Sequence, residues 1–314
     1  MARVYLLHEN EAWVAPLHAA LDGLGAPHED WFLDAGRVPL YRAPPQGVFY
    51  SRMSASCHSR GHHDAPDFAR AVLGWLEAHG RRVVNGTRAL ALELSKAAQY
   101  AAFVRAGIKV PRSLAAVGRD ETLTAARSLG TGPYILKPNR GGKGLGVRLL
   151  QSLDDMDGTL AALGEEEQPV DGLWLIQDYV ASPEPFITRC EFIAGRFHYA
   201  VRVDTRDGFE LCPADACEIG TPLGTTDKFI IDPRFDHPIL DDYRSFLNAN
   251  GVEIAGIEFV RDAAGEIFTY DLNCNTNYNA QAEAKTGLTL TGAQAVAGFL
   301  AGELEKLPEA AAAE

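Results

Sequence analysis

The sequence predicts a small N-terminal α/β domain followed by a larger α+β region. Over residues 1–86, short apolar segments alternate with segments of helical spacing, the pattern of a sheet covered by helices. From about residue 110 onward, apolar segments follow one another across glycine-containing turns, which favours pairing between neighbouring strands. A length of 314 residues suggests about two domains at roughly 150 residues each, and it allows a large buried core.

In the N-terminal domain, the apolar spacing fixes each predicted element. Val14, Leu17 and Leu21 share one helical face, and Gly80 is a typical residue at a helix C-terminus. The expected strands are residues 3–7, 47–50 and 82–84, and the expected helices are residues 13–24 and 65–79.

The same criteria divide the rest of the chain. The turn at residues 262–266 lies between two strand patterns and indicates a hairpin. Helices are expected at residues 89–106, 122–129, most of 234–250 and 292–304, and strands at residues 134–137, 147–150, 173–180, 197–203, 252–261 and 267–273.

Composition and charge limit the partners. The 29 basic and 42 acidic residues give a net charge of −13, which disfavours binding to nucleic acid or to an anionic membrane. No run of about 18 apolar residues is present, so no membrane helix is expected. Five cysteines, an odd number, fit reduced thiols, and we expect a cytoplasmic protein. Residues 308–314 are low in complexity and are expected to be disordered.

A glycine-rich loop is the first sign of chemistry. Residues 139–146 read Asn-Arg-Gly-Gly-Lys-Gly-Leu-Gly between two expected strands. Lys143 is followed by Gly144, so this is not a Walker loop, and the following strand argues against a dinucleotide-binding fingerprint. Glycines let the backbone approach a phosphate, so the loop could act as a flap over a triphosphate. The alternative is a flexible hairpin tip.

Two lysines strengthen the phosphate interpretation. Lys137 ends an apolar strand immediately before the loop, where its ammonium can neutralise a phosphate. Lys96 lies in a helical segment and is a second candidate, although a solvated helix lysine is the ordinary alternative.

Three acidic or amide side chains indicate a metal site. Glu258 lies within an apolar strand, and Asp271 and Asn273 lie two residues apart on the next strand and so share a face. Buried carboxylates need a partner, and Mg²⁺ prefers oxygen ligands. The alternative is a hydrogen-bonded strand end.

A polar, basic loop at residues 51–63 follows an N-terminal strand. Arg52 in this loop suits a carboxylate of a substrate, because a guanidinium can grip it with two hydrogen bonds. The alternative is a surface arginine paired with Asp64 or Asp67. Two groups of residues could be interpreted as metal ligands: Cys57, His58, His62 and His63, and Cys212 with Cys217. We do not favour this interpretation for either group, and the spacing of the first matches no common zinc pattern.

Together these motifs resemble the ATP-grasp superfamily, and within it the RimK-type carboxylate–amine (alpha-L-glutamate) ligases. Residues 51–56, Ser-Arg-Met-Ser-Ala-Ser, stand where that type carries Pro-Arg-Ile-Gly-Ala-Ser. Residues 107–111, Gly-Ile-Lys-Val-Pro, match its Gly-Ile-x-x-Pro. The resemblance extends over roughly residues 45–300, with the two lysines, the flap, the 175–180 segment and the acidic residues in the same order.

The resemblance implies a three-domain fold with ATP held between two α+β domains. The domains would be residues 1–86, 87–183 and 184–307, with the tail at 308–314. It implies two Mg²⁺ ions, with Mn²⁺ as an alternative, on Glu258, Asp271 and Asn273. The implied nucleotide-binding residues are Lys96, Lys137, Gly141, Gly142, Lys143, Gly144, Gly146, Gln177, Asp178, Val180 and Glu184.

The implied reaction joins a carboxylate and an amine through an acyl phosphate, with release of ADP and phosphate. Arg189 and Arg202 would be the catalytic arginines, and Arg52, Asn275, Tyr278 and Asn279 would bind substrate. The implied substrates are a small-molecule carboxylate and amine, an amino acid or peptide among them.

The chain departs from the family pattern at two places. Ile187 replaces an aspartate, for which Glu184 or Glu191 would have to substitute, and residues 273–279 replace the family's Asn-x-x-Pro-Gly. Glutamate is therefore not carried over as substrate. A small-molecule kinase or a non-catalytic nucleotide-binding protein on the same fold stays open, as does a homo-oligomer.

Overall fold

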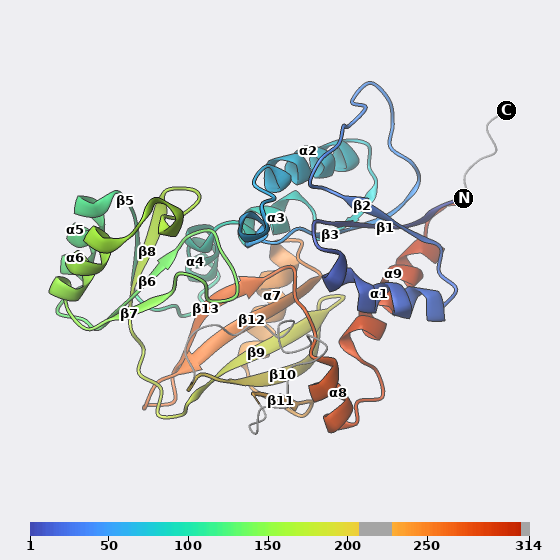
Figure 1. Cartoon of the computed structure of the whole chain (residues 1–314). Helices are drawn as coiled ribbons and strands as arrows, with labels where there is room; N and C mark the ends of the chain where they lie inside the picture. The colour runs from blue at the N-terminus through green and yellow to red at the C-terminus, as the bar shows by residue number, and fades with distance from the viewer. Residues whose placement is uncertain (207–227, 309–314) are drawn as a thin grey trace.

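The part of the chain that the structure describes folds around three sheets (Figure 1). The computed structural model describes residues 1–206 and 228–308. The first sheet is parallel, in the order β2-β1-β3-β4, and the other two are antiparallel. The prediction of an α/β part followed by an α+β part is therefore confirmed. The segment with Cys212 and Cys217 lies outside the described residues.

Alternating side chains let the first sheet bury both faces. On β1, Val4 and Leu6 face helix α1, and Tyr5 and Leu7 face helix α2. Helix α9 packs beside α1 on the same side of the sheet, as the red and blue helices of Figure 1 show. The elements are β1 (Arg3–His8), α1 (Glu11–Gly23), β2 (His28–Phe32), β3 (Gly47–Arg52), the 3-10 helix η1 (Cys57–Arg60), α2 (Ala65–Ala78), β4 (Arg82–Val84) and α9 (Gly292–Glu305).

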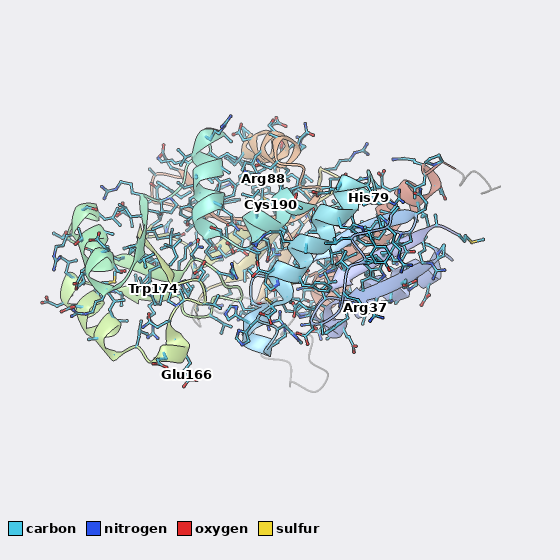
Figure 2. The ribbon with its side chains drawn as sticks, turned by 90° about the horizontal axis from the view of Figure 1, so that it is seen from above. Arg37, His79, Arg88, Glu166, Trp174 and Cys190 are labelled. Carbon is cyan, nitrogen blue, oxygen red and sulfur yellow. The ribbon has the colours of Figure 1, made fainter. Side chains whose placement is uncertain are left out.

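The second sheet, in the order β5-β8-β6-β7, has its own core under helices α5 and α6. Trp174 of this sheet lies at one end of the molecule and His79 toward the other in Figure 2. The glycine-rich loop joins β6 to β7. The elements are β5 (Ser113–Val117), α5 (Arg119–Leu129), β6 (Tyr134–Pro138), β7 (Arg148–Leu150), α6 (Leu153–Ala162), η2 (Glu165–Glu167) and β8 (Leu173–Asp178).

The third sheet, in the order β11-β10-β9-β12-β13, packs one face against helices α3, α4 and α7. Ala282 of α8 joins a smaller core on the other face. The elements are α3 (Thr87–Glu93), α4 (Lys96–Arg105), β9 (Phe186–Ile193), β10 (Arg196–Asp204), β11 (Phe229–Asp232), α7 (Ile239–Ala249), β12 (Ile254–Arg261), β13 (Ile267–Asn273) and α8 (Ala280–Thr286).

Two predicted helices differ in the structure. The helix expected at 89–106 is broken after Leu94, because Ser95 has an extended backbone and caps α4 by accepting a hydrogen bond from the Ala98 amide. Lys96 is consequently the first residue of a helix. The helix expected over most of 234–250 begins only after Pro238.

The domain boundaries at 86/87 and 183/184 remain our proposal. They fall between the sheets, whereas α9, from the C-terminal end of the chain, packs on the first sheet through Val296 and Leu300. Among the described residues, no helix has the length and apolar character needed to span a membrane.

Candidate active site

A cavity of about 420 Å³ lies where the three sheets meet. The N-terminal domain contributes Trp13, Ser54 and Ser56, and the glycine-rich loop contributes residues 141–145. The predicted site residues that line it are Lys96, Lys137, Gly141, Gly142, Lys143, Gly144, Gln177, Val180, Glu184, Arg189, Glu258, Asp271, Asn273 and Asn275. Most of the residues that the sequence singles out therefore converge on one cavity.

A row of charged side chains crosses three strands at the cavity wall. Arg189 on β9 lies opposite Glu258 on β12, and Glu258 lies opposite Asp271 on β13. Directly opposite residues on neighbouring strands project to the same face of a sheet. One extra residue of β13, Tyr270, interrupts the register here, and this bulge lets both Tyr270 and Asp271 line the cavity.

The predicted metal ligands lie within reach of one another. The Asn273 amide nitrogen is 3.3 Å from a Glu258 oxygen and 3.4 Å from an Asp271 oxygen. Burial raises the pKa of Glu258, and Arg189 offsets only part of that rise. Two partly buried carboxylates and an amide that can rotate its oxygen inward are the donor set that Mg²⁺ prefers, so the residues fit such an ion. No cluster of three or more His, Cys, Asp or Glu side chains suited to a metal occurs in the described part of the chain, and the third member here is an amide.

Lys96 is not a solvated helix lysine. Its Nζ lies 2.7 Å from Asp271 Oδ1, and its side chain is 12% exposed. Burial alone would lower the pKa of Lys96, but Asp271 and the nearby carboxylates of Glu93 and Glu258 raise it overall. The ammonium therefore stays charged next to the predicted metal ligands.

Lys137 sits deeper in the same wall. Its Nζ donates to the Tyr100 hydroxyl at 2.9 Å and to the Tyr270 carbonyl at 3.3 Å, and the Tyr100 hydroxyl donates to Gln177 Oε1 at 2.7 Å. Burial, and next the charge of Lys96, lower the pKa of Lys137 to about 7. An anionic phosphate in the cavity would reverse that loss of charge.

Arg189 is held rigidly at the back of the cavity. It donates from Nε to Glu191 at 2.6 Å, from Nη1 to Glu258 at 3.2 Å, and from Nη2 to the Thr276 hydroxyl at 2.5 Å. Thr276 in turn donates to the second oxygen of Glu191 at 2.7 Å. Glu191 is thus the carboxylate that orients Arg189, while Glu184 is exposed at the cavity mouth.

Arg52 is a buried arginine, which excludes the interpretation as a surface residue paired with Asp64 or Asp67. It donates to Asn275 Oδ1 at 3.0 Å, to the Thr276 carbonyl at 3.1 Å and to Asn277 Oδ1 at 2.8 Å. The guanidinium therefore joins the N-terminal domain to the loop after β13. Direct contact of Arg52 with a substrate carboxylate stays a prediction.

Besides Arg52, five predicted residues lie outside the cavity lining. Asp178 pairs with Arg112, and a Cβ added at Gly146 would lie 3.0 Å from Cγ of Pro138. Arg202 on β10 is exposed and projects from the other face of the sheet than Arg189 does. Its guanidinium lies over the Phe186 ring. Asn279 caps α8, and the ring of Tyr278 packs on Gly292. These placements give no support to the predicted direct roles of Arg202, Tyr278 and Asn279.

The sequence analysis missed Glu93, which also lines the cavity. Glu93 ends α3 and accepts hydrogen bonds from the amides of Cys274 at 2.6 Å and Ala55 at 3.3 Å. Burial raises its pKa despite those two donors. Glu93 therefore holds both the loop after β13 and the polar loop at residues 51–63, which we call the serine loop. An acidic residue within an alanine- and leucine-rich helix was the signal that could have found it.

The comparisons agree with this geometry. No family model matches the chain. The ATP-grasp ligase PsnB, complexed with a minimal precursor, superposes with a TM-score of 0.67 at 16% identity, covering 96% of this chain and 99% of that one. A RimK domain ATP-grasp protein from Sphaerobacter thermophilus gives 0.66 over 95% and 99%, and the D-cycloserine synthetase DcsG gives 0.65 over 96% and 99%, both at 16% identity.

The chain therefore has the ATP-grasp fold, the class that the motifs predicted. Among curated proteins it is similar to a probable alpha-L-glutamate ligase of Xanthomonas campestris, at 26% identity over 141 residues, which is 45% of this chain and 47% of that protein. A probable alpha-L-glutamate ligase of Xanthomonas euvesicatoria matches at 25% over 45% and 46%. The chain thus matches about half the length of these relatives, and the resemblance to RimK-type ATP-grasp ligases is confirmed at that level.

Proposed function

We propose that this protein is an ATP-dependent carboxylate–amine ligase that forms an amide through an acyl phosphate. One observation supports the proposal above all. The cations of Lys96, Lys137 and Arg189 and the acidic row, by which we mean the carboxylates of Glu258 and Asp271, all line one cavity together with a glycine-rich flap. Cations, carboxylates and backbone amides gathered in this way suit a nucleoside triphosphate and its transferring phosphoryl group.

In the first step, a substrate carboxylate oxygen attacks the γ-phosphorus of ATP. The bond from phosphorus to the bridging oxygen breaks, and ADP leaves with that oxygen. Lys96 and Lys137 balance the charge of the phosphates, and the flap excludes water from them. Glu258, Asp271 and Asn273 would hold Mg²⁺, which supplies charge neutralisation at the phosphate oxygens.

In the second step, an amine nitrogen attacks the carbonyl carbon of the acyl phosphate. The C–O bond to the phosphate breaks, inorganic phosphate leaves, and the nitrogen loses a proton to give the amide. Arg189 lies beside Glu258 and is fixed by Glu191, so its guanidinium can stabilise the negative charge that develops on the reacting group.

The substrates that we propose are a small carboxylic acid and an amine, with amino acids and peptides as the first classes to test. One structural neighbour, PsnB, is described as complexed with a precursor peptide, and the curated relatives are named for glutamate. The loop after β13 differs from the family pattern, so neither substrate is assigned to this chain.

A screen for ADP release across pairs of carboxylic and amino acids tests the proposal, with products weighed by mass spectrometry. Hydroxylamine in place of the amine should trap the acyl phosphate as a hydroxamate. ADP released together with an amide or a hydroxamate supports the ligase, whereas a stable phosphorylated product in their place contradicts it.

A further inference from the structure

One indole connects the N-terminal domain to the flap. Trp13, on helix α1, lines the cavity although it belongs to none of the motifs that define the nucleotide site. The guanidinium carbon of Arg60 lies 4.7 Å from the centre of its ring, and the Nζ of Lys143, at the flap tip, lies 5.4 Å from it. Both distances are within the reach of about 6 Å over which a cation is attracted to an aromatic ring.

The N-terminal side of this contact is rigid. Arg60 makes two parallel hydrogen bonds to Glu9, from Nη2 at 2.7 Å and from Nε at 3.0 Å. Glu9 follows β1 and is almost fully buried. Arg60 also donates to the Ser56 hydroxyl at 3.3 Å. Bidentate arginine–carboxylate pairs fix orientation strongly, so the indole rests on a preorganised support.

The flap approaches this support at a second point. A side-chain carbon added at Gly142 would lie 3.5 Å from both the Cβ and the Oγ of Ser56. Lys143 has a φ of +62°, a left-handed conformation that a residue other than glycine keeps only when its surroundings hold it. The flap tip is therefore positioned by the serine loop and by the indole together.

We propose that Trp13 is a positioning residue that holds the flap over the cavity through Lys143. Because Trp13, Ser56 and Arg60 all belong to the N-terminal domain, the position of the flap depends on that domain, which also carries Arg52, the predicted substrate-binding arginine. The inference rests on the proposed function only where it takes the glycine-rich loop at residues 139–146 as a flap over the phosphates. The contact between Trp13 and Lys143 involves only side chains of the protein itself.

Limited trypsin digestion of the nucleotide-free protein tests this contact directly. The bond after Arg140 lies in the flap, and Trp13→Leu should increase its cleavage rate by about 2- to 30-fold, the factor that one cation–aromatic contact is worth. Trp13→Phe should restore part of the protection, because a phenyl ring attracts a cation less than an indole does. The matched control is Tyr41→Leu, which removes an exposed ring with Arg42 over it, far from the flap in sequence and outside the cavity lining.

A second variant keeps the test decisive if Trp13→Leu folds poorly. Lys143→Met leaves the core untouched and should increase cleavage after Arg140 to the same degree. In the double variant the cleavage rate should be no higher than in either single variant, because each substitution removes the same contact between Trp13 and Lys143. Multiplying effects, or a Lys143→Met rate equal to that of the natural protein, would overturn the inference.

Nucleotide affinity separates this inference from the proposed function. Binding of a non-hydrolysable ATP analogue with Mg²⁺ should weaken by a similar factor in Trp13→Leu and recover in Trp13→Phe. If the natural protein binds no analogue, the proposed function fails, and the nucleotide-free digestion still decides whether Trp13 holds the flap.

Discussion

Replacing Gly256 by alanine should displace the Arg189 guanidinium and so reduce activity, although Arg189 itself is not substituted. Gly256 lies on β12 beside Arg189, and a Cβ added there would lie 2.8 Å from Nη2 and 2.9 Å from Cζ of that arginine, and closer still to Nε. These atoms cannot yield easily, because Glu191, Glu258 and Thr276 all bind the guanidinium. The methyl group must therefore displace Arg189 or the strand.

The size of the effect follows from what is displaced. Overpacking a closely packed site costs about 1–3 kcal/mol of unfolding free energy. The loss of one fixed donor to a developing negative charge reduces kcat by about 10²- to 10³-fold in other enzymes. We therefore expect a folded but destabilised Gly256→Ala variant with ADP release reduced by at least about 10²-fold at saturating ATP.

The control is Gly158→Ala on helix α6, where an added Cβ meets no atom within 4 Å. This change should leave activity unaltered, and it should stabilise the helix by about 0.5–1 kcal/mol. Thermal unfolding and ADP release are measured for both variants. Gly256→Ala with the activity and melting temperature of the natural protein would show that Arg189 does not occupy the position described here.

Three further predictions concern the cavity. Asp271→Asn should leave the fold intact but abolish ADP formation even in saturating Mg²⁺, because a carboxylate of the acidic row is lost; near-normal turnover would contradict the site, and circular dichroism checks the fold. Lys137, with a pKa of about 7, is mostly neutral at pH 8, so ATP binding should take up about one proton, since phosphate raises that pKa again; calorimetry in buffers of different ionisation enthalpy measures this uptake, which Lys137→Met should remove. Arg52→Lys should raise the KM for one non-nucleotide substrate several-fold and change that for ATP less, because it loosens the loop with Asn275 and Asn277; an equal rise in both KM values speaks against this assignment.

The sequence predicted the residues of the candidate site better than it predicted the residues that hold them in position. Lys137, Glu258, Asp271 and Asn273 could be recognised because polar side chains in apolar strands next to a glycine-rich loop are unusual. Strand β9 was missed, since its buried Arg189 and Glu191 interrupt the apolar pattern. They are tolerated there because Arg189 pairs with both Glu191 and Glu258. Such pairing is decided by tertiary structure.

Contacts between distant segments were beyond prediction for a similar reason. Arg52 and the loop at 275–277 are more than 220 residues apart, and no local pattern encodes their hydrogen bonds. The break at Ser95 was overlooked because alanine and leucine flank it on both sides, although a serine can cap a helix. Trp13 was assigned only to an amphipathic helix, whose spacing says nothing about the flap that it contacts.

Isotope transfer tests the central claim most directly. A carboxylic acid labelled with ¹⁸O in both carboxylate oxygens is incubated with ATP, Mg²⁺, the amine and the protein, and the released phosphate is analysed by mass spectrometry. Formation of an acyl phosphate predicts one ¹⁸O atom in each inorganic phosphate, because the carboxylate oxygen that attacks phosphorus leaves with it. Amide formation with unlabelled phosphate, or with the label in AMP, would contradict the account.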